Sequence, residues 1–588
     1  MNEQNYQHVF AFAIGPVQGF IAAGRKSSDL QYGSVLLSSL ARAGAEVITS
    51  RYGLDNLIFP AMSTDDKNDT ASVPNKIVAV IPDQPTKVGA EVEKAIRQHL
   101  VKLRDQALKR KGGKFNRILA EKQIDDLLEV YWVGVAYDGS NEGYVRARNL
   151  AEHLLSARKS TRNFRQAHGD SAPKSSIDGQ RESVIHESWY PTQKDDERTK
   201  QEKAKKLFEA FGARPAERLS GVDLMKRLGG RGRSFPSTSD MAAKPFLKYV
   251  DNHDIKGDSQ AMLQEIKQML QDYDIDADKE EGALVYSSRL VEWVSDEALR
   301  KTVTERLEEI LSDYADKRRP DPYYALLVAD GDNMGKVIDH QKSIATHKEL
   351  SAQLNRFAQK VAGIVEQHEG ALIYAGGDDV MAYLPLHTVL KCAQKLADEF
   401  ENQMKGFTSE NNTSPTLSTG IVIAHHLTPL SDTLEKARQA ERAAKSVTGK
   451  HALAITVSKR SGVDRTIRGK RKEMAERLAV MIGWRRNGDI SAGTPYELHE
   501  LHRLLSETEI PRNDLMEEAL RIIDRKRESG GGEMSQEKRE EIRKRFKDWF
   551  AQKELSLEEI AYEMIIAGQL AAAQDMAGIP QTESGGNS

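Results

Sequence analysis

Acidic residues in the second half of the chain lie in two short segments that could hold divalent cations. Asp378 and Asp379 follow Gly376-Gly377 in a tight connection between two apolar runs, and Asp330 ends an earlier apolar run. Carboxylates that are brought together repel one another unless a cation lies among them, and oxygen ligands favour Mg²⁺ or Mn²⁺. Two such ions can activate a hydroxyl and stabilise a pyrophosphate leaving group. These residues therefore predict metal-dependent nucleotidyl transfer.

The surrounding sequence has the element order that would bring these carboxylates together. Apolar runs typical of buried strands alternate with helical patterns as β-α-β-β-α-β, the split βαβ or ferredoxin-like arrangement. Because the two central strands of this arrangement are neighbours, we expect Asp330 to converge on Asp378 and Asp379. The expected elements are strand 324–329, helix 347–368, strands 371–374 and 380–384, helix 392–404, strand 417–424 and helix 431–447.

Neighbouring residues fit a nucleotide site, although each has a simpler interpretation alone. Gly376 and Gly377 permit a tight turn and leave room for a nucleotide, and Lys445 could reach a triphosphate as a point charge. Gly-Gly-Asp-Asp is also an ordinary hairpin-turn composition, the segment 330–333 suits a surface turn, and Lys445 suits a solvated helix. Their order within one β-α-β-β-α-β block favours the catalytic interpretation.

Composition limits the class of protein. The chain has 588 residues, of which 39% are hydrophobic and 29% charged, with a net charge of −3, which predicts a globular protein of several domains. We find no run of about 18 apolar residues and no secretion signal, and we expect a cytoplasmic location without membrane contact. The single cysteine, Cys392, excludes an internal disulfide and a multi-cysteine zinc site, so we expect no bound zinc.

The rest of the chain contains further strand and helix patterns. Strands are expected at 9–14, 76–81 and 130–135, with Gly15-Pro16 ending the first. The segment 156–205 has few apolar anchors, and we predict a mobile insertion there. Residues 215–315 and those after 470 have helical patterns, and the last ten or so residues resemble a disordered tail.

The second block resembles GGDEF-type nucleotidyl cyclases and the palm of polymerases. The segment 330–335 resembles their first metal strand, Gly376–Asp379 their signature hairpin, and Leu417–Gly420 the strand that follows. Ala443–Lys445 with Gly449 resembles their phosphate-contacting helix. The ending Asp-Asp, in place of Glu-Phe, resembles the large subunit of type III CRISPR complexes.

The first part of the chain resembles the first palm of the Cmr, or III-B, form of that subunit. The similar segments occur in the family's order from about residue 9 onward. They are Ile14–Gln18, Phe20-Ile21, Arg25-Lys26, Asp29-Leu30, Gly33-Ser34, Pro74–Lys76, Leu219–Arg227 and Phe235–Ser239.

This resemblance implies a fold and a division of the chain. The fold class is α+β multidomain, with two ferredoxin-like (split βαβ) palm domains, a helical middle domain and a helical C-terminal domain. The expected domains are 1–214, a first palm that we interpret as catalytically silent, 215–315, 316–470 with the Gly-Gly-Asp-Asp hairpin, and 471–588.

The resemblance also implies a reaction, partners and site residues. In a crRNA-guided complex with other type III-B subunits, target RNA would trigger attack of the 3′-hydroxyl of one ATP on the α-phosphate of another, giving a cyclic oligoadenylate. The two metal ions would be held by Asp330, Gly331, Asp378 and Asp379. The nucleotides would be contacted by Asp332, Asn333, Gly335, Gly376, Gly377 and Lys445, and by Gln18 and Ser34 of the first palm.

Two departures from the family pattern qualify this expectation. The palm pattern starts within the first ten residues, without an HD nuclease domain before it, and His253-Asp254 has no accompanying ligands, so we expect no cleavage of single-stranded DNA. The four-cysteine zinc site of many relatives is also missing. Basic clusters at 109–114 and 465–472 are interpreted as solvated segments, with any RNA contact local or shared with partner subunits.

Three alternatives remain. The acceptor could be S-adenosylmethionine in place of a second ATP. The chain could be a non-catalytic scaffold, against which the intact metal motif argues. It could also be a free-standing diguanylate cyclase, against which the Asp-Asp ending, the first palm and the long helical C-terminal region argue.

Overall fold

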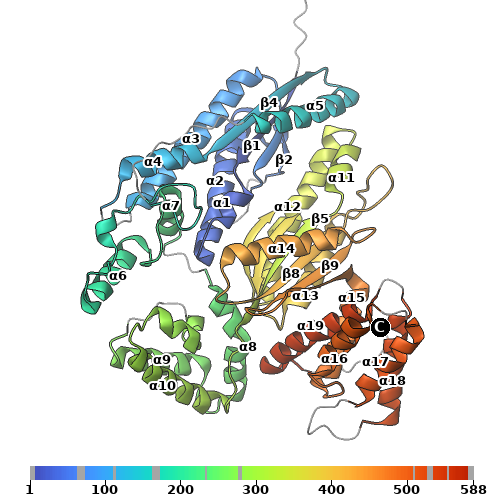
Figure 1. Ribbon diagram of the computed structural model, residues 1–588. Helices are drawn as coiled ribbons and strands as arrows, with labels where there is room; N and C mark the ends of the chain where they lie inside the picture. The colour runs from blue at the N-terminus through green and yellow to red at the C-terminus, as the bar shows by residue number, and fades with distance from the viewer. Residues whose placement is uncertain are drawn as a thin grey trace, which may run out of the picture.

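The chain forms two β-sheets with helices packed around and below them (Figure 1). The computed structural model describes residues 7–62, 73–109, 114–161, 173–231, 235–275, 281–507, 510–525, 534–552 and 555–580. In Figure 1 the N-terminal sheet lies above the second sheet, and the C-terminal helices lie below it. The fold is a multidomain α+β fold, as predicted.

The first sheet has ferredoxin-like strand order. Its strands are β1 (Gln7–Gly15), β2 (Leu57–Phe59), β3 (Lys76–Ile81) and β4 (Glu129–Tyr137), in the order β2-β3-β1-β4. The connections carry α1 (Gln18–Ala22), α2 (Ser27–Tyr52), α3 (Pro85–Lys109) and α4 (Arg117–Leu127), and α5 (Asn141–Ser160) follows β4.

Strand β1 is continuously apolar because both of its faces are covered. Phe10 and Phe12 enter the core that contains α2 and α3, whereas Val9 and Ala11 pack in a separate cluster with residues of α5. Successive side chains of a strand point to opposite faces. The unbroken apolar run in the sequence therefore marks a central strand between two layers of helix.

The second sheet confirms the predicted β-α-β-β-α-β order and extends it. Its first part is β5 (Tyr323–Gly331), α11 (Met334–His340), α12 (Ile344–Gln367), β6 (Ala371–Gly376), β7 (Asp379–Leu384), α13 (Val389–Gln403) and β8 (Leu417–His425). The strand order β8-β5-β7-β6 is again ferredoxin-like. Helix α14 (Leu430–Lys445) then leads to β9 (Ala452–Ser458), which is parallel to β8, and to β10 (Arg465–Lys470), which is antiparallel to β9.

Helices form the remaining regions. Between the sheets along the chain lie α6 (Glu197–Phe211), α7 (Gly221–Gly229), α8 (Thr238–His253), α9 (Ser259–Asp272) and α10 (Glu297–Ala315). The C-terminal helices are α15 (Arg471–Arg486), α16 (Thr494–Leu505), α17 (Arg512–Arg525), α18 (Gln536–Phe550) and α19 (Leu557–Met576). The domain boundaries at 214, 315 and 470 stay predictions.

The prediction of a mobile insertion at 156–205 is wrong for its described part. The segment includes the end of α5, the start of α6 and a short 3₁₀ turn, Glu187–Trp189. Val184, Ile185 and Tyr190 are buried in the first core. These few apolar residues lie among many charged ones, so the average composition of the segment did not reveal them. Residues 162–172 lie outside the described residues.

Two further predictions concern the C-terminus and the membrane. The last eight residues, which belong to the predicted disordered tail, lie outside the described residues. Within the described residues, none of the helices is long and apolar enough to cross a membrane.

The two sheet regions are joined by buried polar contacts. The hydroxyl of Tyr144 on α5 lies 2.7 Å from Nδ1 of His347 on α12. The buried guanidinium of Arg148 donates to the carbonyls of Gln341 at 2.9 Å and Asp339 at 3.1 Å, at the C-terminal end of α11. A cation is favourable at a helix C-terminus. These contacts fix α5 of the first region against the loop and helix that follow β5.

Candidate active site

The β6–β7 hairpin presents Asp378 and Asp379 at its tip. Gly377 has φ +81°, a left-handed conformation that glycine adopts without strain. A side chain at Gly376 would collide with the ring and hydroxyl of Tyr374. The sequence Gly-Gly-Asp-Asp therefore has a structural cause for both glycines: one makes the turn and the other makes room for Tyr374.

The end of β5 touches this hairpin tip. A Cβ atom on Gly331 would lie 2.8 Å from Cβ of Asp378 and 3.0 Å from its Oδ2, so only glycine allows this approach. Asp330 precedes Gly331 on β5, which pairs with β7 on one side and with β8 on the other. The structure thus brings Asp330, Gly331, Asp378 and Asp379 to one edge of the sheet.

The hairpin carboxylates favour protonation when no cation is bound. Burial, with the charge of Asp379 adding to it, raises the pKa of Asp378 to about 7, and burial raises the pKa of Asp379 to about 6. The Asp379 side chain is solvent-exposed whereas Asp378 is half-buried, so we expect the rise at Asp379 to be the smaller in solution. A bound divalent cation would favour the ionised forms.

These pKa shifts predict how stability depends on pH. Above pH 4 the unfolded chain has ionised Asp378, while the folded metal-free protein still holds the proton up to about pH 7. The folded state therefore binds more protons, and stability falls as pH rises from about 4 to 7. After a discount for solvent screening, we expect a loss on the order of 1–2 kcal/mol. Urea denaturation at several pH values, with EDTA or with excess Mn²⁺, measures it.

The Asp378→Asn variant is the control for this prediction. Because its side chain cannot ionise, its stability should not show this fall, and Mn²⁺ should remove most of the fall from the wild-type protein. An equal fall in the variant would assign the pH dependence to other groups.

Helix α14 presents a lysine and a glutamate to the same carboxylates. Lys445 contacts Asp330 and lies 3.2 Å from Glu441, one helical turn earlier. Burial and the charge of Lys450 lower the pKa of Lys445 to about 8, so it is largely protonated at neutral pH. Burial and the charge of Asp379 raise the pKa of Glu441. The helix packs closely here, since a Cβ on Gly420 of β8 would lie 2.2 Å from the Glu441 amide nitrogen.

Asp332 and Asn333 hold the loop after β5 in place. The buried Asp332 accepts hydrogen bonds from the hydroxyls of Thr416 and Ser418, at 2.7 and 2.8 Å, and from the amide of His451 at 3.1 Å. Asn333 has φ +60° and accepts from Nζ of Lys450 at 3.1 Å. Asp332, predicted as a nucleotide contact, is therefore engaged with protein groups through one of its oxygens. Gly335 lies in the first turn of α11, and a Cβ there would have no other atom of the described residues within 4 Å, apart from its chain neighbours and the helix backbone.

The carboxylates fit a divalent cation, although they are not arranged as a completed cage. Among the described residues, no group of three or more His, Cys, Asp or Glu has the arrangement of a metal site. The predicted convergence of three carboxylates is thus incomplete, since Asp330 contacts Lys445 instead. The pKa of Asp378 is raised partly by the negative charge of Asp379. A bound cation would remove this repulsion between the two carboxylates. This donor set suits Mg²⁺ or Mn²⁺.

The two predicted residues of the first palm have different surroundings. Gln18 is exposed on α1, and its carbonyl accepts a hydrogen bond from Arg438 of α14 at 3.3 Å. This contact places Gln18 beside the helix that carries Lys445. Ser34 is buried within α2. Residues 63–72 of the β2–β3 connection, which include Asp65-Asp66, lie outside the described residues, so the catalytic silence of the first palm stays a prediction.

His253-Asp254 and Cys392 have structural surroundings. His253 ends α8, where its Nδ1 lies 2.8 Å from the Tyr249 carbonyl and its ring stacks on that of Tyr249, and Asp254 is the left-handed residue after the helix. Cys392 is buried in α13, and burial raises the pKa of its thiol to about 12.

Comparisons with known proteins agree with this geometry. Residues 323–454 match the family model for the Cas10/Cmr2 second palm domain, and residues 9–105 match the model for the N-terminal part of the CRISPR-associated protein Cmr2. The CRISPR system Cmr subunit Cmr2 of Pyrococcus furiosus is 27% identical over 540 residues. Over these segments the chain is similar to the Cas10/Cmr2 family. The alignment covers 76% of this chain and 61% of that relative.

Solved structures with a similar fold agree with this architecture. A chain from the type III-B Cmr-beta complex in its apo state superimposes with a TM-score of 0.64 at 15% identity, over 96% of this chain and 82% of that one. A chain of the same complex bound to cognate target RNA gives a TM-score of 0.61, over 96% and 83%. The similarity of fold therefore extends beyond the matched palm segments into the helical regions.

Sequence reasoning missed Glu441 and Tyr374. Tyr374 fills the space above Gly376, and burial, with Asp379 and Asp378 contributing, raises the pKa of its hydroxyl. Glu441 has one signal in the sequence, its i, i+4 spacing to Lys445, which places both on one face of the helix. Tyr374 has none, because its role depends on the fold of the hairpin over its side chain.

Proposed function

We propose that the second palm is a nucleotidyltransferase that uses ATP and makes a cyclic oligoadenylate. The observation that supports this most is the pair of carboxylates at the hairpin tip, in contact with the end of the Asp330 strand and opposite a lysine from α14. Acidic oxygens on one side and the half-buried cation of Lys445 on the other suit a triphosphate whose α-phosphate is attacked.

The roles of the residues follow from their placement. Asp330, Asp378 and Asp379, with the Gly331 backbone, would hold two divalent ions. Bound ions would supply activation of the attacking 3′-hydroxyl and stabilisation of the pyrophosphate leaving group. Lys445 would exchange its contact with Asp330 for the triphosphate, with Glu441 keeping it in place. Where a Cβ on Gly377 would lie, Phe59 is the one side chain of the described residues within 4 Å, and this space would admit a nucleotide close to the backbone.

The proposal includes the assembly in which this reaction is triggered. We propose that the chain works with the other subunits of a type III-B CRISPR complex, crRNA and target RNA. The similarity to a Cmr2 subunit and to chains of the Cmr-beta complex supports this. The net charge of −3 agrees with RNA contacts shared among subunits and not spread over this chain alone.

Mass spectrometry of the product tests the acceptor and the nucleotide. We expect oligoadenylates from ATP and Mg²⁺ or Mn²⁺ with the assembled complex and target RNA. If adenylated S-adenosylmethionine forms when S-adenosylmethionine is added, the acceptor is S-adenosylmethionine and not a second ATP. Cyclic diguanylate from GTP would overturn the choice of nucleotide, and the absence of any product would favour the non-catalytic scaffold.

The Lys445→Ala variant should impair the reaction less than loss of a carboxylate. It removes one charge-assisted phosphate contact and no metal ligand, so we expect a decrease in kcat/KM of roughly ten- to hundredfold. Because the Lys445 contact with Asp330 is also removed, Mn²⁺ binding without nucleotide should be unchanged or tighter. Steady-state kinetics and Mn²⁺ titration check both. Weaker Mn²⁺ binding would contradict this role for Lys445.

A further inference from the structure

Strand β10 lies between the C-terminal helices and the turn that follows α14. This turn, Ser446–Lys450, is called the phosphate turn below. Alternate residues of β10 face opposite ways, as the period of a strand requires. On one side the guanidinium of Arg465 lies 5.7 Å from the Tyr562 ring centroid of α19, and a Cβ on Gly469 would lie 3.8 Å from Met474 of α15. Arg468 and Lys470 face the phosphate turn.

These two cations hold the phosphate turn at both ends. Arg468 donates from Nη1 to the hydroxyl of Ser446 at 3.0 Å, and Lys470 donates from Nζ to the carbonyl of Lys450 at 2.9 Å. Between them, Gly449 has φ +73°, and a Cβ there would lie 2.9 Å from Nζ of Lys470. A side chain at this position would crowd the ammonium group of Lys470, and the left-handed backbone also favours glycine.

The other side of the phosphate turn faces the loop after β5. Lys450 donates to the side chain of Asn333 at 3.1 Å, and the next residue, His451, donates its amide to Asp332. The apolar cluster beneath is small, consisting of Ala444, Ala452 and Ala454 with two partly buried neighbours. With so little apolar burial, the position of the turn depends on these hydrogen bonds.

Charges are separated along this edge of the sheet. The carboxylates lie at β5 and the β6–β7 hairpin, whereas Lys450 and Lys470 lie beside β9 and β10. The strand order β10-β9-β8-β5 puts β10 three strand spacings, roughly 14 Å, from the Asp330 strand. Arg468 and Lys470 are therefore remote from a phosphate held at the carboxylates, but they contact the phosphate turn.

We propose that Arg468 and Lys470 are positioning residues that hold the phosphate turn so that Lys445 and Lys450 meet the terminal phosphates of the bound nucleoside triphosphate. This inference rests on the proposed function. It gives β10, which lies beyond the matched palm segment ending at residue 454, a part in substrate binding. It also links that binding to α15 and α19, which pack on the opposite face of the strand.

Nucleotide binding tests this proposal without requiring catalysis. A non-hydrolysable ATP analogue and AMP are titrated, with Mg²⁺, into complexes assembled with Arg468→Ala, Arg468→Gln, Lys470→Met or Lys472→Ala. Lys472 is exposed on the first turn of α15 and is the matched control, because its removal changes the net charge equally. We expect the Kd of the analogue to rise about tenfold for Arg468→Ala and Lys470→Met, and that of AMP to change less than twofold.

The glutamine variant separates positioning from direct attraction. Arg468→Gln keeps an N–H donor for Ser446 but loses the charge, so a positioning role predicts affinity close to the wild type. Affinity as weak as that of Arg468→Ala would overturn positioning in favour of charge. If Arg468→Ala and Lys470→Met bind the analogue as tightly as Lys472→Ala does, or weaken AMP binding equally, the inference alone is overturned. Wild-type complex that binds no ATP analogue would overturn the proposed function as well.

Discussion

Replacing Asp378 and Asp379 together by alanine should abolish nucleotide synthesis while the complex still assembles and binds target RNA. Both carboxylates lie at the hairpin tip, and their pKa values are raised by burial, so they destabilise the metal-free fold when ionised. Their removal should cost little stability and could increase it. Loss of these ligands should remove several kcal/mol of transition-state stabilisation, about a thousandfold or more in rate.

Product formation from ATP, measured beside a gel shift with target RNA, checks this expectation. Asp330→Ala should behave in the same way, because it removes the ligand from the neighbouring strand. Glu366→Ala, which removes an exposed carboxylate on α12, is the control and should keep full activity. Near wild-type synthesis by the double variant would show that the site is assigned wrongly, and failure to assemble would show that the hairpin pair is structural.

The Arg227→Met variant should destabilise the first palm strongly. Arg227 of α7 is buried and makes paired hydrogen bonds with Asp29 of α2 at 2.9 Å, and with Glu217 at 3.1 and 3.2 Å. Burial alone would raise the pKa of Asp29, but Arg227 outweighs it and holds that pKa below its usual value. Without the guanidinium two buried carboxylates lose their main compensating charge, and we expect a loss of about 3–5 kcal/mol.

Urea denaturation together with hydrogen exchange at amides of α2 and α7 measures this loss, because exchange isolates one region of a multidomain chain. Arg198→Met, at a largely exposed arginine of α6, should stay within about 0.5 kcal/mol of the wild type. Adding Asp29→Asn to Arg227→Met should recover part of the stability, since it removes one of the uncompensated charges. No difference between Arg227→Met and Arg198→Met would refute a stabilising role for this cluster.

The strands that carry the site were predictable because their residues are locally consistent. Val380–Leu384 and Leu417–Ala424 are apolar runs of strand length, and both lie in strands of the second sheet. The hairpin between 374 and 380 was predictable because two adjacent glycines are unfavourable inside a strand and therefore indicate a turn. These signals depend on neighbouring residues and need no knowledge of the rest of the chain.

Other parts of the site depend on contacts between distant segments. Lys470 and Lys450 are separated by 20 residues, and Arg438 meets Gln18 across 420 residues. The periodicity of apolar residues along the sequence cannot predict contacts between such distant residues. The segment 465–472, interpreted as a solvated basic cluster, includes the buried Arg471, whose guanidinium bonds to Asp398 and Glu401 at 2.8 Å. That interpretation is wrong for Arg471, because its acidic partners come from α13, about 70 residues earlier.

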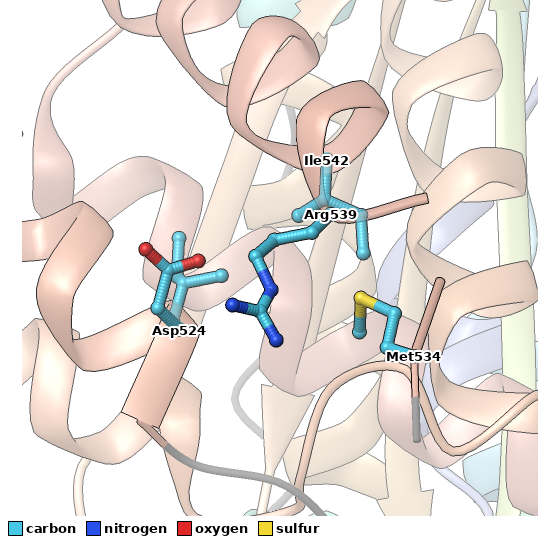
Figure 2. Close-up of a pocket in the computed structure, with 5 residues that line it drawn as sticks. Asp524, Met534, Arg539 and Ile542 are labelled. Atoms are coloured by element: carbon cyan, nitrogen blue, oxygen red, sulfur yellow. The ribbon is translucent and has the colours of Figure 1, made fainter. Parts of the chain in front are cut away.

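The small hollow in the C-terminal helices does not compete with the carboxylates as a site. It is lined by Ile523, Asp524, Met534, Arg539 and Ile542, and Figure 2 shows the Arg539 guanidinium between Asp524 and Met534. It lies between α17 and α18, whereas the hairpin and α14 belong to the second sheet region (Figure 1).

Conversion of labelled ATP by the assembled complex, with Mg²⁺ or Mn²⁺ and with or without target RNA, tests the central claim most directly. We predict that target RNA triggers the release of labelled pyrophosphate from γ-labelled ATP, together with incorporation of α-label into an oligonucleotide. EDTA should stop both. Pyrophosphate release that persists at the same rate in the Asp378→Ala, Asp379→Ala complex, or no conversion by wild-type complex with bound target RNA, would contradict a nucleotidyltransferase site at the β6–β7 hairpin.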